Sequence, residues 1–141
     1  MRFYSGFATT KGPHRNVNQD SIAVFEAGYG KDRMIMALVC DGMGGEENGE
    51  KASRACLEVL EKWFRNVLIE YEPDFSIIKI KKSLEKIIKF INELLCQYTY
   101  ETGIRIGTTL SLLFINCKNE YIVCHVGDSR IYLINKKITK T

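Results

Sequence analysis

Two aspartates in this sequence stand at the ends of apolar, strand-like runs and beside glycines. Asp41 follows residues 34–40, and three of the four residues after it are glycines, beginning with Gly42. Asp128 follows the run 121–126 and a single glycine. Carboxylates and backbone carbonyls are the oxygen ligands that hard dications such as Mg²⁺ and Mn²⁺ prefer. Asp-Gly pairs are also frequent turn signals, so either aspartate alone fits a turn, whereas the two together favour a shared metal site.

A third candidate element is the stretch RNVNQD at residues 15–20. The planar guanidinium of Arg15 suits phosphate oxygens, although a single arginine in a loop is more often simply solvated. Gln19 and Asp20 lie at the entry to another strand-like run, where Asp20 also fits an ordinary capping role.

The other polar candidates receive no catalytic role. The hydroxyl pair Thr108-Thr109 enters a strand-like run, where packing or turn bonding is the usual explanation. Neither His14 nor His125 stands in a Ser/His/Asp or Cys/His arrangement. We expect His125 to be a packed strand residue.

Hydrophobic periodicity predicts the elements that must position these residues. Strands are predicted over residues 2–10, 21–27, 34–40, 108–117, 121–126 and 129–135, with a tight turn at Lys118-Asn119. Helices are predicted over residues 46–69 and after Pro73 up to Tyr98, the second capped by Asp74 or Ser76. The second helix has heptad-like spacing, but it is short and lacks paired charges, which favours a helix packed on a sheet over a coiled coil. This order of elements indicates an α+β fold with antiparallel sheet.

Composition sets broad limits on what the chain does. At 141 residues, with 45% hydrophobic and 26% charged residues, it fits one globular domain. The net charge of +3 comes from scattered lysines, so we expect neither nucleic-acid nor membrane binding. The N-terminus has no signal-peptide pattern, and no window approaches the ~20 apolar residues of a membrane span. The five cysteines lie in apolar runs without metal-ligand spacing, which favours reduced core thiols in a cytoplasmic protein.

Four ordered stretches of the chain resemble one known family. They are RNVNQDS, VCDGMGGEENGEKAS, GTTLSLL and VGDSRIYLI. Together they resemble the metal-dependent (type 2C, PPM) serine/threonine protein phosphatases, in their bacterial form. The resemblance implies an α-β-β-α sandwich, in which two antiparallel sheets lie between helices. Residues 1–141 would form the N-terminal portion of a single phosphatase domain of this kind.

The resemblance also implies a set of metal ligands. Asp41 would bridge two Mn²⁺ or Mg²⁺ ions, and the Gly42 carbonyl would bind one of them. Asp128 is similar to the family aspartate associated with a third, weaker ion. Gln19 stands where many members have a glutamate that reaches a metal through water, and Asp20 would be a weak contributor.

The implied activity is hydrolysis of phosphoserine and phosphothreonine in proteins that a Ser/Thr kinase has phosphorylated. Arg15 is similar to the arginine that holds the substrate phosphate, and Met43 stands where animal members have a histidine discussed as the general acid. Two dications can activate a water molecule for attack, so no protein nucleophile is needed.

The family domain is longer than this chain, and the resemblance leaves its two further metal-binding aspartates without counterparts here. We therefore expect weak metal binding and little hydrolysis from the chain alone. Three interpretations remain open: a fragment of a longer phosphatase, a half-domain that pairs with a complementing C-terminal half, and a pseudophosphatase that binds phosphoproteins. A receiver domain phosphorylated on Asp41 is disfavoured, because that fold requires alternating strands and helices.

Overall fold

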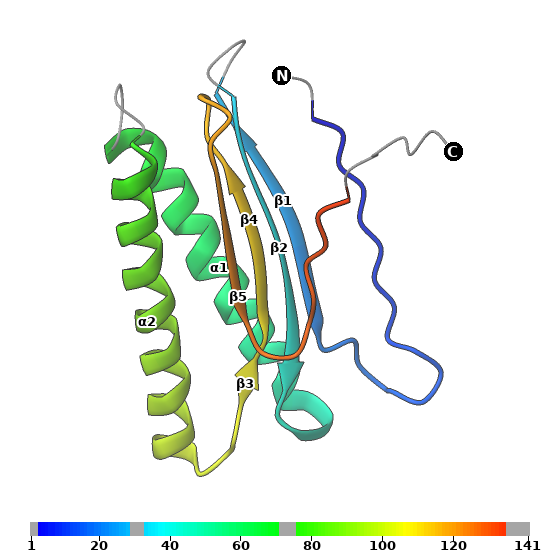
Figure 1. Cartoon of the computed structure of the whole chain (residues 1–141). Coiled ribbons are helices and arrows are strands. Elements are labelled where there is room, and N and C mark those ends of the chain that lie inside the picture. The colour runs from blue at the N-terminus through cyan, green and yellow to red at the C-terminus, as the bar shows by residue number, and fades with distance from the viewer. Residues whose placement is uncertain (1–2, 29–32, 71–75, 135–141) are drawn as a thin grey trace.

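The computed structural model describes residues 3–28, 33–70 and 76–134, which form an antiparallel sheet with two long helices against it (Figure 1). The strands are β1 (Asp20–Ala27), β2 (Met34–Met43), β3 (Gly107–Thr108), β4 (Leu110–Ile115) and β5 (Tyr121–Val126). The spatial order is β1-β2-β4-β5, and the short β3 pairs with the end of β2. The helices are α1 (Gly45–Glu70) and α2 (Ile77–Thr102). All described strand pairs are antiparallel, which confirms the predicted α+β layout.

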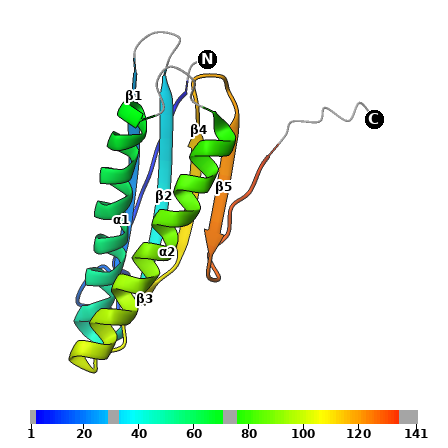
Figure 2. The same cartoon turned by 90° about the vertical axis from the view of Figure 1, so that its left-hand side faces the viewer.

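Both helices cover the same face of the sheet (Figure 2). The core lies between these two layers and takes alternate residues of β2, the inner faces of β4 and α1, and a stripe of α2. Its central members are Met36, Leu38, Leu60, Phe64, Ile80, Leu84, Leu112 and Phe114. The indole N–H of Trp63 in α1 donates a hydrogen bond of 2.9 Å to Ser83 Oγ in α2 and so links the helices. The prediction of a helix packed on a sheet, rather than a coiled coil, is therefore confirmed.

The opposite face of the sheet is apolar and only partly covered. A groove of about 300 Å³ runs over it, and Phe7 and Ile131 line this groove from the segments before β1 and after β5. Val39 and Val123, which point away from the helices, remain 39% and 47% exposed. The described residues thus provide one helix layer and one sheet layer of the implied sandwich.

Two predicted strands are wrong. Residues 3–10 and 129–134 have no strand pairing, and Arg2 and Asn135 lie outside the described residues. Alternating side chains favour an extended backbone, but a strand also needs a neighbour for its hydrogen bonds. Within the described part of the chain, no such neighbour exists for either segment.

Other boundaries differ by a few residues. The third predicted strand does not stop at Cys40, because β2 continues to Met43. The predicted strand over 108–117 is divided into β3 and β4 at Thr109. Ser76 is the N-cap residue of α2 without a side-chain capping bond, and Asp74 lies outside the described residues. The turn at Lys118-Asn119 is confirmed, and Asn119 has the positive φ of 62° that asparagine tolerates.

The cysteines are free thiols, as predicted, but not all of them belong to the core. Cys40 and Cys56 are buried, Cys117 and Cys124 are half-buried, and Cys96 is exposed. Cys96 lies on α2 one residue after Leu95, which packs against the core, so its side chain points elsewhere.

Neither of the two described helices has the combination of length and apolar character that a membrane span requires.

Candidate metal centre

The candidate residues meet in one row across the end of the sheet. Asp20, the first residue of β1, pairs directly with Asp41 of β2. On the other side of β2, the pairs Val39↔Ser111 and Gly42↔Thr108 place Thr109 beside Asp41. The β4–β5 register, which pairs Leu110 with Val126, brings Gly127 next to Thr109. Asp128 follows immediately, so the sheet register alone brings the two glycine-flanked aspartates to the same end.

Asp20 and Asp41 are like charges that lie directly opposite each other on the adjacent strands β1 and β2. This arrangement is destabilising when nothing neutralises it. Burial raises the pKa of Asp20 above its ordinary value of 3.8, and the negative charge of Asp41 and a hydrogen bond to it raise this pKa further. All three effects act against the ionised form of Asp20. A cation between the two carboxylates would remove this repulsion.

A polar cleft of about 530 Å³ contains all the candidates. Its lining consists of Thr10, Lys11, Arg15, Val17, Asn18, Gln19, Asp20, Asp41, Gly42, Met43, Gly44, Gly45 and Asp128. The structure therefore brings together every residue that the sequence singled out for metal or phosphate binding. It also adds Lys11, a second cation that the sequence reasoning missed. An exposed lysine in an N-terminal loop carries no signal by which it could have been found.

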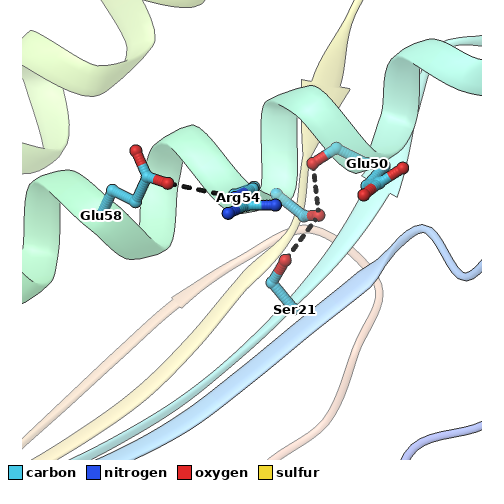
Figure 3. A network of polar contacts seen from close by, with 5 residues as sticks. Ser21, Glu50, Arg54 and Glu58 are labelled. Carbon is cyan, nitrogen blue, oxygen red and sulfur yellow. Dashed lines mark hydrogen bonds and ion pairs between the residues drawn. The ribbon is translucent and has the colours of Figure 1, made fainter.

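The segment before β1 is anchored to the start of α1. Ser53 Oγ of α1 donates a hydrogen bond of 2.7 Å to the Gln19 carbonyl. Because that bond uses its one proton, Ser53 accepts from the Ser21 hydroxyl at 2.9 Å. Figure 3 shows Ser21 of β1 lying beneath the first turns of α1, near Glu50. The Gln19 carbonyl also accepts from the Gly42 N–H at 3.2 Å, so both strands of the acidic pair are held at this point.

Two glycines permit this close packing of α1 against β2. A Cβ atom at Gly42 would collide with the Gly49 carbonyl and lie 2.7 Å from the Gln19 carbonyl oxygen. A Cβ atom at Gly49 would lie 2.7 Å from the Gly42 carbonyl oxygen. The sequence reasoning noticed Gly42 as a source of exposed backbone but missed Gly49. Their separation of seven residues, across a strand-to-helix turn, is the signal that would have connected them.

The donor set suits a hard dication. The carboxylates of Asp20 and Asp41 and the carbonyl of Gly42 offer oxygen atoms, which Mg²⁺ and Mn²⁺ prefer over softer ligands. Asp128 lines the same cleft, but the described residues contain no cluster of three Asp, Glu, His or Cys side chains that could hold a metal. The oxygen atoms of Asp41, Gly42 and Asp20 would therefore fit one dication, and a second ion would need oxygen ligands beyond them.

The remaining predicted groups have clear positions. The described residues provide no hydrogen-bond or ion-pair partner for the exposed Arg15 guanidinium, which lines the cleft. The Gln19 side-chain N–H donates to the Gly45 carbonyl, which leaves its amide oxygen as the acceptor. His125 is exposed rather than packed, and its Nε2–H donates to the Gly127 carbonyl at 3.0 Å. Its Nδ1 accepts from the Ser111 hydroxyl at 3.2 Å, so this histidine has a structural role.

Comparisons with known proteins agree with one another. The serine/threonine phosphatase stp of Listeria innocua is 29% identical over 97% of this chain and 52% of its own length. Protein phosphatase PhpP of Streptococcus pneumoniae is 30% identical over 89% of this chain and 48% of its own length. A crystal structure of a bacterial serine phosphatase variant superposes with a TM-score of 0.76 at 30% identity, over 97% of this chain and 59% of that chain.

The chain spans about half the length of the curated relatives that it matches. The family description "Protein phosphatase 2C" matches residues 14–139, which is most of the chain and includes every element of the described sheet. On this evidence the chain belongs to the protein phosphatase 2C family.

Proposed function

We propose that this chain forms the metal- and phosphate-binding part of an enzyme that hydrolyses phosphoserine and phosphothreonine in proteins. The observation that supports the proposal is the convergence of Asp20, Asp41, Asp128 and Arg15 on one polar cleft at the end of the sheet. Family membership supports the reaction class. The proposed substrates are the phosphorylated products of a Ser/Thr kinase, and the proposed location is the cytoplasm.

In this proposal, Asp41 and the Gly42 carbonyl would hold the catalytic ions, Asp20 would be a weaker carboxylate donor, and Asp128 would serve a further ion. When bound, a pair of Mn²⁺ or Mg²⁺ ions lowers the pKa of a water molecule toward neutrality and offsets charge on the phosphoryl oxygens. The amide oxygen of Gln19 orients a water molecule, because its N–H is already bonded to Gly45. No serine, cysteine or histidine nucleophile is required.

Arg15 binds the substrate in this scheme. Its guanidinium can donate two parallel hydrogen bonds to phosphate oxygens, which holds the phosphoester next to the carboxylates. Attack by water yields inorganic phosphate and the free serine or threonine hydroxyl. Met43 is 57% exposed at the edge of the cleft and has no proton to donate, so the leaving oxygen takes its proton from solvent.

An assay of phosphate release tests this function. With p-nitrophenyl phosphate and a phosphothreonine peptide, we expect release that depends on Mn²⁺, that is weak for this chain, and that Asp41→Asn abolishes. The rate is low because two central carboxylates leave a pair of dications poorly neutralised unless further oxygen ligands are supplied. Release that persists without any dication, or that is the same in Asp41→Asn, would contradict the proposal.

A second candidate function is phosphoprotein binding without hydrolysis. It is favoured by the lack of a three-ligand metal cluster among the described residues, together with the unpartnered guanidinium of Arg15. A phosphopeptide that binds the chain, and binds Arg15→Ala much more weakly, without release of phosphate at saturating Mn²⁺, would select this function over hydrolysis.

A further inference from the structure

Thr109 is almost fully buried, with 2% of its surface exposed, and lies where the strand is interrupted between β3 and β4. Its backbone N–H donates a hydrogen bond of 2.9 Å to the Asp41 carbonyl. Its side-chain Oγ1 accepts a bond of 3.0 Å from the Asp41 N–H. One residue therefore binds both backbone polar groups of Asp41, and this fixes the direction in which the Asp41 carboxylate leaves the sheet.

The same hydroxyl also reaches the other strand end. Thr109 Oγ1 lies 3.0 Å from Ser129 Oγ, in the residue that follows Asp128. Because its lone pair already accepts from the Asp41 N–H, its proton is available for Ser129. The methyl group of Thr109 also packs closely against Gly127, because a Cβ atom at Gly127 would lie 2.6 Å from Thr109 Cγ2. The two segments that carry Asp41 and Asp128 thus meet on one side chain.

From these contacts we infer that Thr109 is a positioning residue that ties the Asp41 strand end to the Asp128 loop and sets the spacing of their carboxylates. The inference rests on the proposed metal-binding function, and it gives a role to a hydroxyl that contacts no substrate. Residues that orient metal ligands through hydrogen bonds commonly affect metal affinity by about 10–100-fold.

Three variants of the full chain separate positioning from general stability. Thr109→Val keeps the branched shape and removes the hydroxyl, whereas Thr109→Ser keeps the hydroxyl. Ser83→Ala is the matched control, because it also deletes a hydroxyl that accepts one N–H, from Trp63, within the helix layer. Circular dichroism melting of all three variants shows whether each one is folded and how much stability each loses relative to the wild type.

The first readout is Mn²⁺ affinity, measured by electron paramagnetic resonance of the free ion. We expect Thr109→Val to raise the Kd by about tenfold, Thr109→Ser to recover most of this loss, and Ser83→Ala to leave the Kd unchanged. Equal affinities of Thr109→Val and Ser83→Ala would overturn the inference.

The second readout needs no metal. By NMR, Thr109→Val should accelerate hydrogen exchange at the Asp41 amide and shift the amide resonances of Asp128 and Ser129, and Ser83→Ala should do neither. If the wild-type chain binds no Mn²⁺, the proposed function fails. The positioning role of Thr109 is still tested in that case, by amide exchange at Asp41 and by the amide resonances of Asp128 and Ser129. Unchanged exchange at Asp41 together with unchanged Asp128 resonances would overturn it.

Discussion

The two aspartate-bearing strand ends are built differently. Asp41 lies within β2, with a strand on each side, and both its N–H and its carbonyl are bonded to Thr109. The next residue, Gly42, is packed against α1 with no room for a methyl group. Asp128 lies beyond the end of β5, is exposed, and is held through its neighbours Gly127 and Ser129. The Asp41 end is therefore held firmly by its own backbone bonds, whereas the Asp128 end is held only through its neighbours.

The largest effect should come from Gly42→Ala. The added methyl group meets the backbone of Gly49 and Gln19, which cannot rotate away, and such overpacking costs about 1–3 kcal/mol or more. We expect a lower free energy of unfolding in urea and loss of Mn²⁺ binding. Gly6→Ala is the control, because nothing lies within 4 Å of a Cβ atom there.

Gly127→Ala extends this test to the other strand end. The two atoms nearest to its methyl group are side-chain atoms of Thr109, at a backbone φ of 107°, whereas the methyl group at Gly42 meets backbone atoms. The loss of stability should therefore be smaller than for Gly42→Ala. An equal or larger loss would show that the Asp128 end is as rigid as the Asp41 end.

Asp41→Asn should have the next largest effect, and it acts on binding rather than on folding. It removes the carboxylate that we propose as a direct ligand, so the Kd for Mn²⁺ should rise by more than the about 10–100-fold typical of residues one step from the metal. Stability without metal should not fall, because the substitution also removes the repulsion between Asp41 and Asp20. Isothermal titration and urea unfolding measure the two quantities.

Asp128→Asn should have a smaller effect on the same Kd. Asp128 is exposed and lies beyond the end of β5, and such an exposed charge contributes about 0.2–1 kcal/mol, which corresponds to at most about fivefold in affinity. A loss as large as that of Asp41→Asn would contradict the contrast between the two ends.

The smallest effect concerns pH in the absence of metal. The pKa of Asp20 is raised in the folded state above 3.8, so folding favours its protonated form. This contribution to stability is complete below the ordinary pKa and is lost as the pH rises through the raised pKa. Asp20→Asn should therefore be more stable than the wild type at neutral pH, and the difference should shrink on acidification. Urea unfolding of both proteins across this range measures it.

The sequence was most informative where polar residues stand at the ends of segments with clear hydrophobic periodicity. Asp41, Asp128, Arg15, Gln19 and Asp20 were all selected from it, and the structure places them in one cleft. Their individual roles remain predictions. The long helices and the central strands followed from hydrophobic spacing, because amphipathic patterns report which face is buried.

The parts that sequence reasoning missed depend on register and on close packing. Thr109 matters because it falls opposite Asp41, and Ser53 matters because it reaches the Gln19 carbonyl. Neither partner is near in sequence, and no local pattern encodes the pairing. The strands predicted over residues 2–10 and 129–135 were wrong for the same reason. Alternation of apolar and polar side chains is a property of one segment, whereas a β-strand needs a second segment to pair with.

The central claim is that the Asp41 and Asp128 strand ends gather divalent cations in one place. Paramagnetic broadening by Mn²⁺ in an amide NMR spectrum of the chain tests it directly. We predict that low Mn²⁺ broadens Asp20, Asp41 and Gly42 first and Asp128 next, while residues in the middle of α2 are unaffected. Broadening centred on the helix carboxylates, or none at millimolar Mn²⁺, would contradict it.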